Sequence, residues 1–508
     1  MKRILCLLLC VILLTGCAKR TKEYVPTGDA LSVDDEPVVN PNEEVKEQTL
    51  QLAYYPDRTM NPYTSTDYTN RALFSLIYQG LFTTGRDYRA EPMLCKTYTV
   101  SEDMRTYVFY LEEATFSDGT VLTPQDVLAS LQTARTSTIY KGRFHNVVDI
   151  SILADNGIMI QMSTPYEDLP ILLDVPIIKE DQQEEDRPLG TGPYVLETTE
   201  MSACLRRRTN WWCDPQMVIT APVISLYGAE SVTDIRDEFE FGDVTLVCAD
   251  PGSDRYADYR CDFELWDCEN GIFMYLACNK ASAVFSNDAV RVALTYAINR
   301  DLLVKEYYRG FARSASLPAS PLSPYYNTAL AEKYGYDQEK FTQAVLDAGM
   351  EGSLVRLLVN REDSLRLRAA REIGDMLTQC GLTVEIMELA GSEYRYALET
   401  WNFDIYLGQT KLSPNMDLSA FFSAYGALSY GGINDVEAYA LCQRSLENHG
   451  NYYTLHQTVM ENGLLCPVLF RSYAVYANRG ALTDLTPARD NVFFYSLGKT
   501  MESALITE

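Results

Sequence analysis

Apolar residues recur along the chain in two alternating patterns, one typical of strands and the other typical of helices. Short runs of β-branched and aromatic residues predict buried strands, whereas apolar residues three or four positions apart predict amphipathic helices. The clearest example is a strand over 354–359, a helix over 364–379 and a strand over 383–387, with Gly381 placed to end the helix. Further strands are predicted at 50–54, 98–100, 107–111, 147–153, 157–162, 194–197, 205–208, 223–227, 244–247, 273–278, 403–407 and 466–477, and further helices at 72–81, 234–241, 287–300, 391–400 and 437–447. This alternation is typical of an α/β fold.

The stretch 107–130 contains the sharpest local signals. After its strand, Ser117-Asp118-Gly119 predicts a turn, because glycine accepts positive φ at little cost. Thr123 is then suited to cap a helix, with Pro124 at the first helical position and Asp126 in the first turn. We therefore expect a strand, a turn and a helix in succession.

The N-terminus predicts export from the cell. Two basic residues precede an apolar run over 4–14, which is too short to span a membrane as mature protein and is typical of a signal peptide. The following Leu14-Thr15-Gly16-Cys17 resembles the lipobox of bacterial lipoproteins, which implies that residues 1–17 are the signal and that Cys17 becomes a diacylated N-terminus. An ordinary cleaved signal with an incidental cysteine is the alternative. Residues 18–47 are polar and charged, which predicts a flexible tether to the outer face of the cell membrane.

Charge and cysteine content limit the possible partners. The net charge of −27 argues against binding to nucleic acid or to anionic lipid, but it does not by itself indicate a cationic ligand. Ten of the 13 cysteines follow the proposed lipidation site, and none of the ten shows C-x-x-C spacing. Disulfides and buried free thiols both remain open from the sequence.

Several motifs, in a fixed order, resemble those of the family 5 extracellular solute-binding proteins of ABC importers, the oligopeptide- and dipeptide-binding group. The pattern F-x-D-G-T-x-L-T-x-x-D-V over 116–127 is similar to the signature of that family. The other matching segments are Met60-Asn61-Pro62, Ile77-Tyr78-Gln79-Gly80-Leu81, Glu91-Pro92-Met93-Leu94, Leu189-Gly190-Thr191-Gly192-Pro193-Tyr194 and DAVRVALTYAINR over 288–300.

This resemblance implies a bilobal type II periplasmic-binding-protein fold, in the α/β class, with an extra domain. The expected divisions are lobe I from 48–76, 187–279 and 468–508, domain II from 77–186, and lobe III from 280–467. The resemblance also implies a monomer that captures a peptide or similar small solute between its lobes. The solute would then pass to a membrane permease that works with an ATPase.

The expected ligand contacts lie in two segments. Tyrosines near Asn61 and Pro62 offer flat surfaces with a hydroxyl group, and the chain contains 35 tyrosines in all. In peptide-binding relatives, an aspartate in the loop matched here by 408–417 pairs with the ammonium group of the ligand. Here Lys411 appears, Asp417 ends the loop and no carboxylate stands between Gly408 and Asp417. The candidate contacts are Tyr54, Asn61, Tyr63, Gly408, Gln409, Thr410 and Lys411.

The altered loop leaves the kind of ligand open. One hypothesis is a solute without a clamped amine, or one with an anionic group near Lys411; the alternative is that Lys411 is a solvated loop residue and another acid holds the amine. A nickel–chelator complex or another non-peptide solute is a second possibility, and a purely sensory lipoprotein is a third.

Signals for catalysis are weak. The chain has no G-x-S-x-G or H-E-x-x-H motif, and its three histidines are too far apart in the sequence to suggest a shared metal. We therefore predict no catalytic residue, no bound metal and no cofactor. A secreted hydrolase, which needs a nucleophile and a base in one cleft, is the least favoured function.

Overall fold

The structure is a computed structural model that describes residues 50–251, 259–482 and 484–499, and the backbone of 504–505. The predicted signal peptide, Cys17 and the predicted tether lie outside these residues. Among the described helices, none is both long enough and apolar enough to cross a bilayer.

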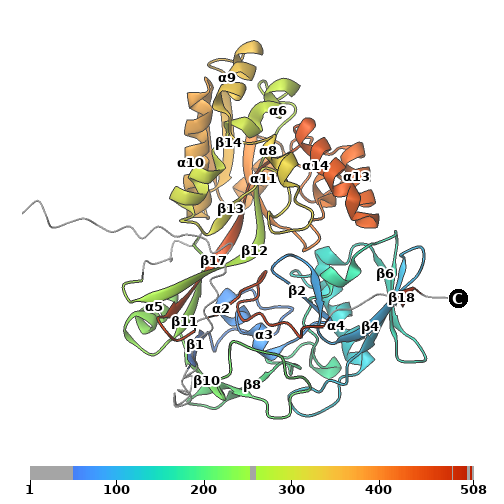
Figure 1. Ribbon diagram of the computed structural model, residues 1–508. Helices are drawn as coiled ribbons and strands as arrows, with labels where there is room; N and C mark the ends of the chain where they lie inside the picture. Colours follow the sequence, from blue (N-terminus) through green and yellow to red (C-terminus); the bar gives the residue numbers. More distant parts are fainter. Residues whose placement is uncertain (1–49, 252–258, 483, 500–503, 506–508) are drawn as a thin grey trace, which may run out of the picture. The chain divides into compact units, whose positions relative to one another are not determined.

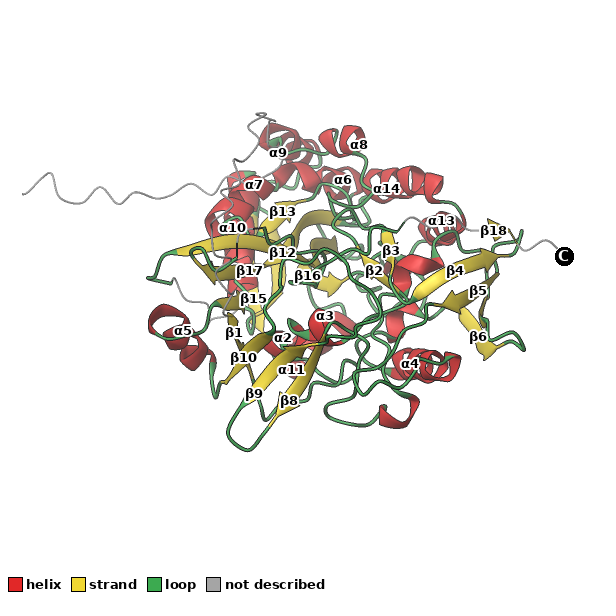
Figure 2. Ribbon diagram, turned by 60° about the horizontal axis from the view of Figure 1, so that its bottom comes forward, coloured by secondary structure: helices red, strands yellow, loops and turns green. Residues whose placement is uncertain are grey.

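One large sheet holds the described part of the molecule together (Figures 1 and 2). Its 11 strands include a continuous path that combines strands from the early, middle and late parts of the chain. Along this path the order is β15 (Thr383–Leu389), β14 (Leu354–Asn360), β16 (Ile405–Lys411), β12 (Phe263–Cys278), β17 (Cys466–Asn478), β11 (Leu246–Ala249), β1 (Leu50–Tyr54), β10 (Val223–Gly228), β9 (Ala203–Arg207) and β8 (Tyr194–Thr198), and β13 (Ala312–Ser314) pairs with β17. The predicted strands at these positions are confirmed, most with ends shifted by a few residues, but β12 begins at Phe263 instead of 273 and β13 was not predicted.

Strands β12 and β17 form the long antiparallel pair at the centre of this sheet. Their register shifts between Glu269 and Phe273, and Gly271 adopts φ +69° within the irregularity. A bulge of this kind bends a strand and strengthens its twist, and glycine accommodates it without strain. Both strands are longer than the sequence predicts, and together they connect the 354–411 half of the sheet to the half built from β1 and β8 to β11 (Figure 1).

A second, five-stranded sheet is built mostly from residues 95–162, and helix α4 (Pro124–Thr136) belongs to the same stretch of the chain. The order of this sheet is β18 (Ala504–Leu505), β4 (Cys95–Val100), β5 (Thr106–Leu111), β7 (Ile158–Met162) and β6 (Val147–Ile152), and β2 (Phe82–Thr84) pairs separately with β3 (Ala90–Pro92). The predicted hairpin of β6 and β7 is confirmed. Helix α4 starts at Thr123, whose backbone N–H donates to the Asp126 carboxylate at 2.9 Å while the Asp126 N–H donates to Thr123 Oγ1. This reciprocal cap confirms the predicted helix start.

The remaining helices gather around β14, β15 and β16 or lie beside the sheet (Figure 1). Helix α10 packs on β14 and β15, as the predicted strand–helix–strand unit requires. The bounds are α5 (Val232–Phe241), α6 (Asp288–Ala297), α7 (Arg300–Leu302), α8 (Thr328–Glu332), α9 (Gln338–Asp347), α10 (Ser364–Gln379), α11 (Gly391–Glu399), α12 (Ser419–Phe422), α13 (Val436–Glu447) and α14 (Tyr452–Glu461).

The single helix predicted over 72–81 is wrong. The chain instead forms two short helices, α2 (Tyr68–Arg71) and α3 (Phe74–Ile77), and becomes extended at Tyr78. The cause is Gly192, whose N–H donates to Ile77 O at 2.9 Å, so this carbonyl is not used to continue the helix. A Cβ at Gly192 would lie 2.6 Å from the Ile77 carbonyl carbon, so the glycine permits this close approach. Apolar spacing misled the prediction because the segment is buried on nearly every side.

All ten described cysteines are free thiols. Six of them are buried, including Cys268 and Cys466 on the central strands. Burial raises the pKa of the Cys95 thiol to about 12, because the thiolate loses its hydration. Of the two alternatives that the sequence leaves open, free thiols are therefore found at all ten described cysteines, and six of these thiols are buried.

Candidate functional site

A cavity of about 830 Å³ opens between segments that are far apart in the sequence. Its wall combines α2 and the residues before it, the 138–145 segment after α4, the end of β16 with the 412–428 segment, Tyr473 of β17, and the 489–490 turn. This volume is in the range of about 300–1,000 Å³ that small-molecule sites occupy. A smaller cavity of about 140 Å³ shares Arg71, Lys411, Arg489 and Asp490 with the large one.

Four of the residues that the two cavities share define what we call the cationic end: Arg71, Lys411, Arg489 and Asp490. Lys411, the last residue of β16, forms an ion pair with Asp490. Arg489 is buried, and its Nη2 donates to Leu412 O at 2.5 Å. Arg71, at the end of α2, donates to Ser65 O at 3.2 Å. Three cationic side chains therefore gather near one carboxylate, which forms its ion pair with Lys411.

The pKa values of the cationic end reflect this crowding. Burial alone would raise the pKa of the Asp490 carboxyl, but Lys411, Arg489 and Arg71 together hold it below its ordinary value. Burial lowers the pKa of Lys411 to about 8; Asp490 opposes this shift, whereas Arg489 and Arg71 reinforce it. The Lys411 side chain is 42% exposed, and it lines both cavities. Its charge is consequently sensitive to any ion that enters.

The backbone next to Arg489 leaves room for its guanidinium group. Gly271, in the bulge of β12, lies directly against it: a Cβ at this position would be 2.6 Å from Arg489 Nη2. Asp490 follows in a tight turn in which Ala488 and Asn491 exchange backbone hydrogen bonds, and Asp490 adopts φ +56°. The turn is attached to β12 by the Asp490 N–H, which donates to Glu269 O at 2.9 Å.

Aromatic and apolar side chains line other parts of the wall. The rings of Tyr68 and Tyr473 stack with centroids 3.5 Å apart and planes inclined by 29°. Phe421, Leu428 and Ile139 also line the cavity. The site can thus hold a molecule with both a polar and an apolar part.

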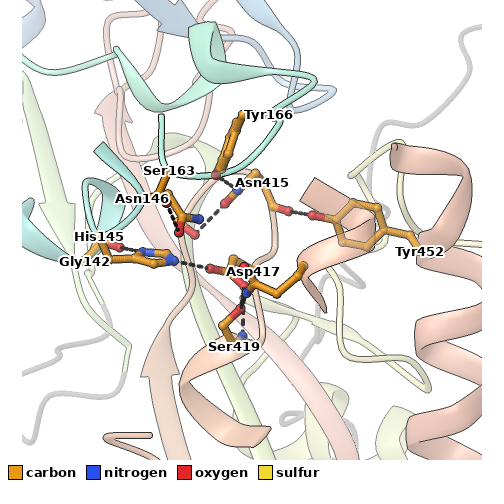
Figure 3. A network of polar contacts seen from close by, with 11 residues as sticks. Gly142, His145, Asn146, Ser163, Tyr166, Asn415, Asp417, Ser419 and Tyr452 are labelled. Atoms are coloured by element: carbon orange, nitrogen blue, oxygen red, sulfur yellow. Dashed lines mark hydrogen bonds and ion pairs between the residues drawn. The ribbon is translucent and has the colours of Figure 1, made fainter. Parts of the chain in front are cut away.

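A polar network connects the 142–166 segment to the 413–452 segment at one side of the cavity (Figure 3). Asn415 lies at its centre: its Nδ2 donates to Tyr166 Oη at 2.6 Å, and its carbonyl accepts from the Tyr452 hydroxyl. Asp417 accepts from the Ser419 N–H at 2.8 Å and lies 3.4 Å from His145 Nε2. We call this set of contacts the Asn415 network.

The structure brings together two of the candidate ligand contacts. Thr410 and Lys411 line the large cavity. Gly408 and Gln409 precede them on β16, and Gln409 Oε1 accepts from Arg471 Nη1 at 3.0 Å. The sequence places 408–411 in a loop after a strand, whereas these residues continue the strand, because β16 pairs with β12 as far as Lys411.

The other three candidates line neither of these two cavities. Tyr54 is buried in β1, and its carbonyl accepts from the Ala229 N–H. Asn61 Nδ2 donates to Gln183 O and Glu185 O, both at 2.9 Å, and the Tyr63 hydroxyl donates to Pro176 O. Their role as ligand contacts stays a prediction.

Residues that the sequence did not single out make up most of the cationic end. Arg71, Arg489 and Asp490 belong to no motif, and Arg71 is more than 400 positions from the other two. The large sheet brings these segments together, since α2 contacts β1 and β11 and the Asp490 N–H is hydrogen-bonded to β12. The absence of an acid between Gly408 and Asp417 was the one usable signal, and it led to Lys411 alone.

Within the described residues, no group of three or more histidine, cysteine, aspartate or glutamate side chains is arranged to hold a metal ion. The cavity itself offers one imidazole, from His145, and the carboxylates of Asp417 and Asp490.

Comparison with known proteins agrees with this architecture. The model of the bacterial extracellular solute-binding proteins, family 5, middle region, matches residues 89–431. The chain belongs to this family. The glutathione-binding protein GsiB of Escherichia coli O1:K1 is 24% identical over 351 residues, which cover 65% of this chain and 67% of GsiB.

Solved structures confirm the predicted fold. The ABC transporter substrate-binding protein CtaP of Listeria monocytogenes superimposes with a TM-score of 0.72 at 18% identity, covering 88% of this chain and 98% of CtaP. NikZ of Campylobacter jejuni, in complex with Ni(L-His), gives a TM-score of 0.63 at 18% identity over 89% of this chain and 98% of NikZ. The family consists of extracellular solute-binding proteins that serve ABC importers. This member is therefore a binding protein and not an enzyme, and the hydrolase alternative is set aside.

Proposed function

We propose that this family member captures a peptide or a similar small solute in the 830 Å³ cavity and delivers it to a membrane permease with its ATPase. The observation that supports this proposal is the composition of the wall. It takes residues from the segments predicted as lobe I, domain II and lobe III, so a bound molecule would contact all three. Movement of these segments about β12 and β17 would then open and close the site.

The test of this proposal is binding without turnover. Purified protein is examined by native mass spectrometry for a retained solute, and by calorimetry against di- to tetrapeptides and glutathione, the ligand in the name of GsiB. We expect one-to-one binding, with every ligand recovered unchanged. Absence of binding to the whole panel and of any retained solute would contradict the proposal.

A nickel–chelator complex is the second candidate. It is favoured by His145, whose imidazole lines the cavity, since imidazole is a common nickel ligand. The cationic end would suit the carboxylates of a chelator. Calorimetry with nickel, histidine and the two combined separates the candidates: binding of the combination alone would favour the chelate over peptides.

We propose further that Cys17 carries the lipid anchor, as the lipobox-like sequence before it implies. Two acyl chains are sufficient for stable attachment to a membrane. Replacement of Cys17 by alanine should therefore release the protein from the membrane fraction. If the variant stays in that fraction to the same extent as the wild type, the anchor is not at Cys17.

A further inference from the structure

The cationic end has more positive charge than its surroundings neutralise, in a chain whose net charge is −27. Among the described residues that line the large cavity, the carboxylates are Asp417 and Asp490. Asp417 is already engaged by Ser419 and lies close to His145. Within the wall of this cavity, only Asp490 is left to balance Arg71, Lys411 and Arg489. Glu269 also acts on Arg489 from outside the cavity, but it lies 3.8 Å from Arg313 Nε and is shared with that residue.

The neighbouring Arg143, unlike Arg71 and Arg489, has a carboxylate partner of its own. Arg143 lines both cavities, but it forms an ion pair with Asp174. In the part of the chain that the structure describes, no carboxylate oxygen lies within 4 Å of a side-chain nitrogen of Arg71 or Arg489. Arg489 Nε is moreover buried and has no hydrogen-bond partner among these residues. Burial of a guanidinium without a counter-ion is unfavourable, so this arrangement favours an incoming anion.

We infer that the solute carries an acidic group, a carboxylate or another oxyanion, which binds at the cationic end between Arg71, Lys411 and Arg489. This inference rests on the proposed function and specifies the chemistry of its ligand. The acid supplies the additional negative charge that these three cations need beside Asp490. Hydrogen bonds between charged groups are short and strong, and a guanidinium offers a planar pair of donors that matches a carboxylate.

The apolar wall places the rest of the solute. The stacked rings of Tyr68 and Tyr473 line the same cavity as the cationic end, and Phe421 and Leu428 continue the apolar surface. A solute with an acidic group at one end and an uncharged body fits both parts. This orientation uses no clamp for an amine, because Asp417 is held by its protein partners.

The first experiment removes the charge from the ligand. Di- to tetrapeptides are titrated by calorimetry as C-terminal acids, as the matching C-terminal amides, and as N-acetylated acids. We expect the amide to bind at least about tenfold more weakly than the acid, since it loses a charge-assisted contact with buried cations. N-acetylation should change affinity less than amidation does.

The second experiment changes the protein, with a matched control. Lys411→Gln and Lys141→Gln each remove one exposed lysine from the wall of the same cavity, but Lys141 is not part of the cationic end. We expect Lys411→Gln to weaken binding of the acid about tenfold and Lys141→Gln less than about threefold, because only Lys411 lies at the end where the acid binds and a more distant charge is screened by water. The affinity for the amide should hardly change in either variant.

A third variant should act in the opposite direction. Asp490→Asn removes the competing carboxylate, and asparagine accepts the positive φ of this turn. It should strengthen binding of the acid roughly threefold or more, since like charge no longer opposes the ligand. A structural role for Asp490 alone would not produce tighter binding.

The outcomes separate the inference from the proposed function. Equal affinities for acids and amides, or a retained solute that is neutral or cationic, would overturn the inference while the protein still counts as a solute receptor. A retained acidic solute that depends on Lys411 supports the inference even if it is not a peptide. Absence of any bound solute in wild-type protein contradicts the proposed function, and the inference fails with it.

Discussion

The cationic end and the Asn415 network contribute to the same cavity but differ in how well their polar groups are partnered. The central groups of the network have protein partners, from Tyr166 through Asn415 to Tyr452 (Figure 3). At its edge, Asn146 Nδ2 is buried without a partner among the described residues. At the cationic end, three cations share Asp490, and a buried nitrogen of Arg489 has no partner among the described residues.

This contrast distinguishes polar groups that stabilise the fold through protein partners from polar groups that are available to bind a ligand. Folding selects partners for buried donors and acceptors, because an unpaired one is costly. A region where that rule is kept contributes to stability. A region where it is broken costs stability and is therefore more informative about function. The following substitutions test whether the two regions differ in this way.

The largest effect on stability is expected from Asn415→Ala. The change removes partners of Tyr166 and Ser413 and leaves a small void at a buried position. We expect the free energy of unfolding to fall by about 2–4 kcal/mol, measured by urea denaturation. Ser163→Ala, beside this network in Figure 3, is the control, because Ser163 is exposed and its contact with Asn146 is long, at 3.5 Å. A similar loss in both variants would show that Asn415 has no special role.

Gly271→Ala should affect both stability and binding. Alanine is strained at φ +69°, and its Cβ would collide with the Arg489 guanidinium. We expect a loss of about 1–3 kcal/mol in the free energy of unfolding together with weaker binding of an acidic solute. Gly352→Ala is the matched control, because Gly352 has φ +73° and no atom within 4 Å of the added Cβ. Equal changes in stability and in binding in the two variants would show that Gly271 has no specific role at the site.

The sequence predicted regular elements far better than it predicted this site. The capped helix after Thr123 and the strand–helix–strand unit over 354–387 depend on neighbours along the chain, so local patterns suffice. The 72–81 segment failed because its backbone is redirected by Gly192, which lies more than 100 residues away. Lys411 was noticed because an expected acid is missing near it. Arg489 and Asp490 had no such signal, because their proximity to Lys411 depends on the turn that joins them to β12.

Affinity for an acidic solute should fall as the pH rises through about 8, the pKa to which burial lowers Lys411. The charged groups around Lys411 are Asp490, Arg489 and Arg71, and the nearby phenols of Tyr68 and Tyr473 stay neutral because burial raises their pKa values. Binding should weaken by up to about tenfold between pH 7 and pH 9, with proton uptake on binding near pH 8. Calorimetry in buffers of different ionisation enthalpy measures both effects. An unchanged profile in Lys411→Gln would show that another group titrates.

The lowered pKa of Lys411 predicts that stability changes with pH in the direction opposite to the affinity for an acidic solute. The folded-state pKa of Lys411 is below its unfolded value, so the unfolded chain binds more protons between the two values. Stability from this residue therefore increases as the pH rises from about 8 towards the ordinary lysine pKa of about 10.4. Because the side chain is partly exposed, the gain should be small. Thermal denaturation of wild type and Lys411→Gln across this range checks the sign.

The smallest effect is expected from His145→Gln. The imidazole is half exposed and lies 3.4 Å from Asp417, which keeps its hydrogen bonds to Ser419 in the variant. We expect the free energy of unfolding to change by less than about 1 kcal/mol, and by less still at high salt. A loss as large as that of Asn415→Ala would mean that the network depends on this ion pair.

The bulge in β12 has a mechanical consequence. Gly271 lies where the register of the two central strands slips, and it also touches the guanidinium that we assign to the solute. An acid bound to Arg489 would therefore act directly on the irregular part of the central strand pair. Binding and bending would then be coupled at one position, without a chain of intermediate residues.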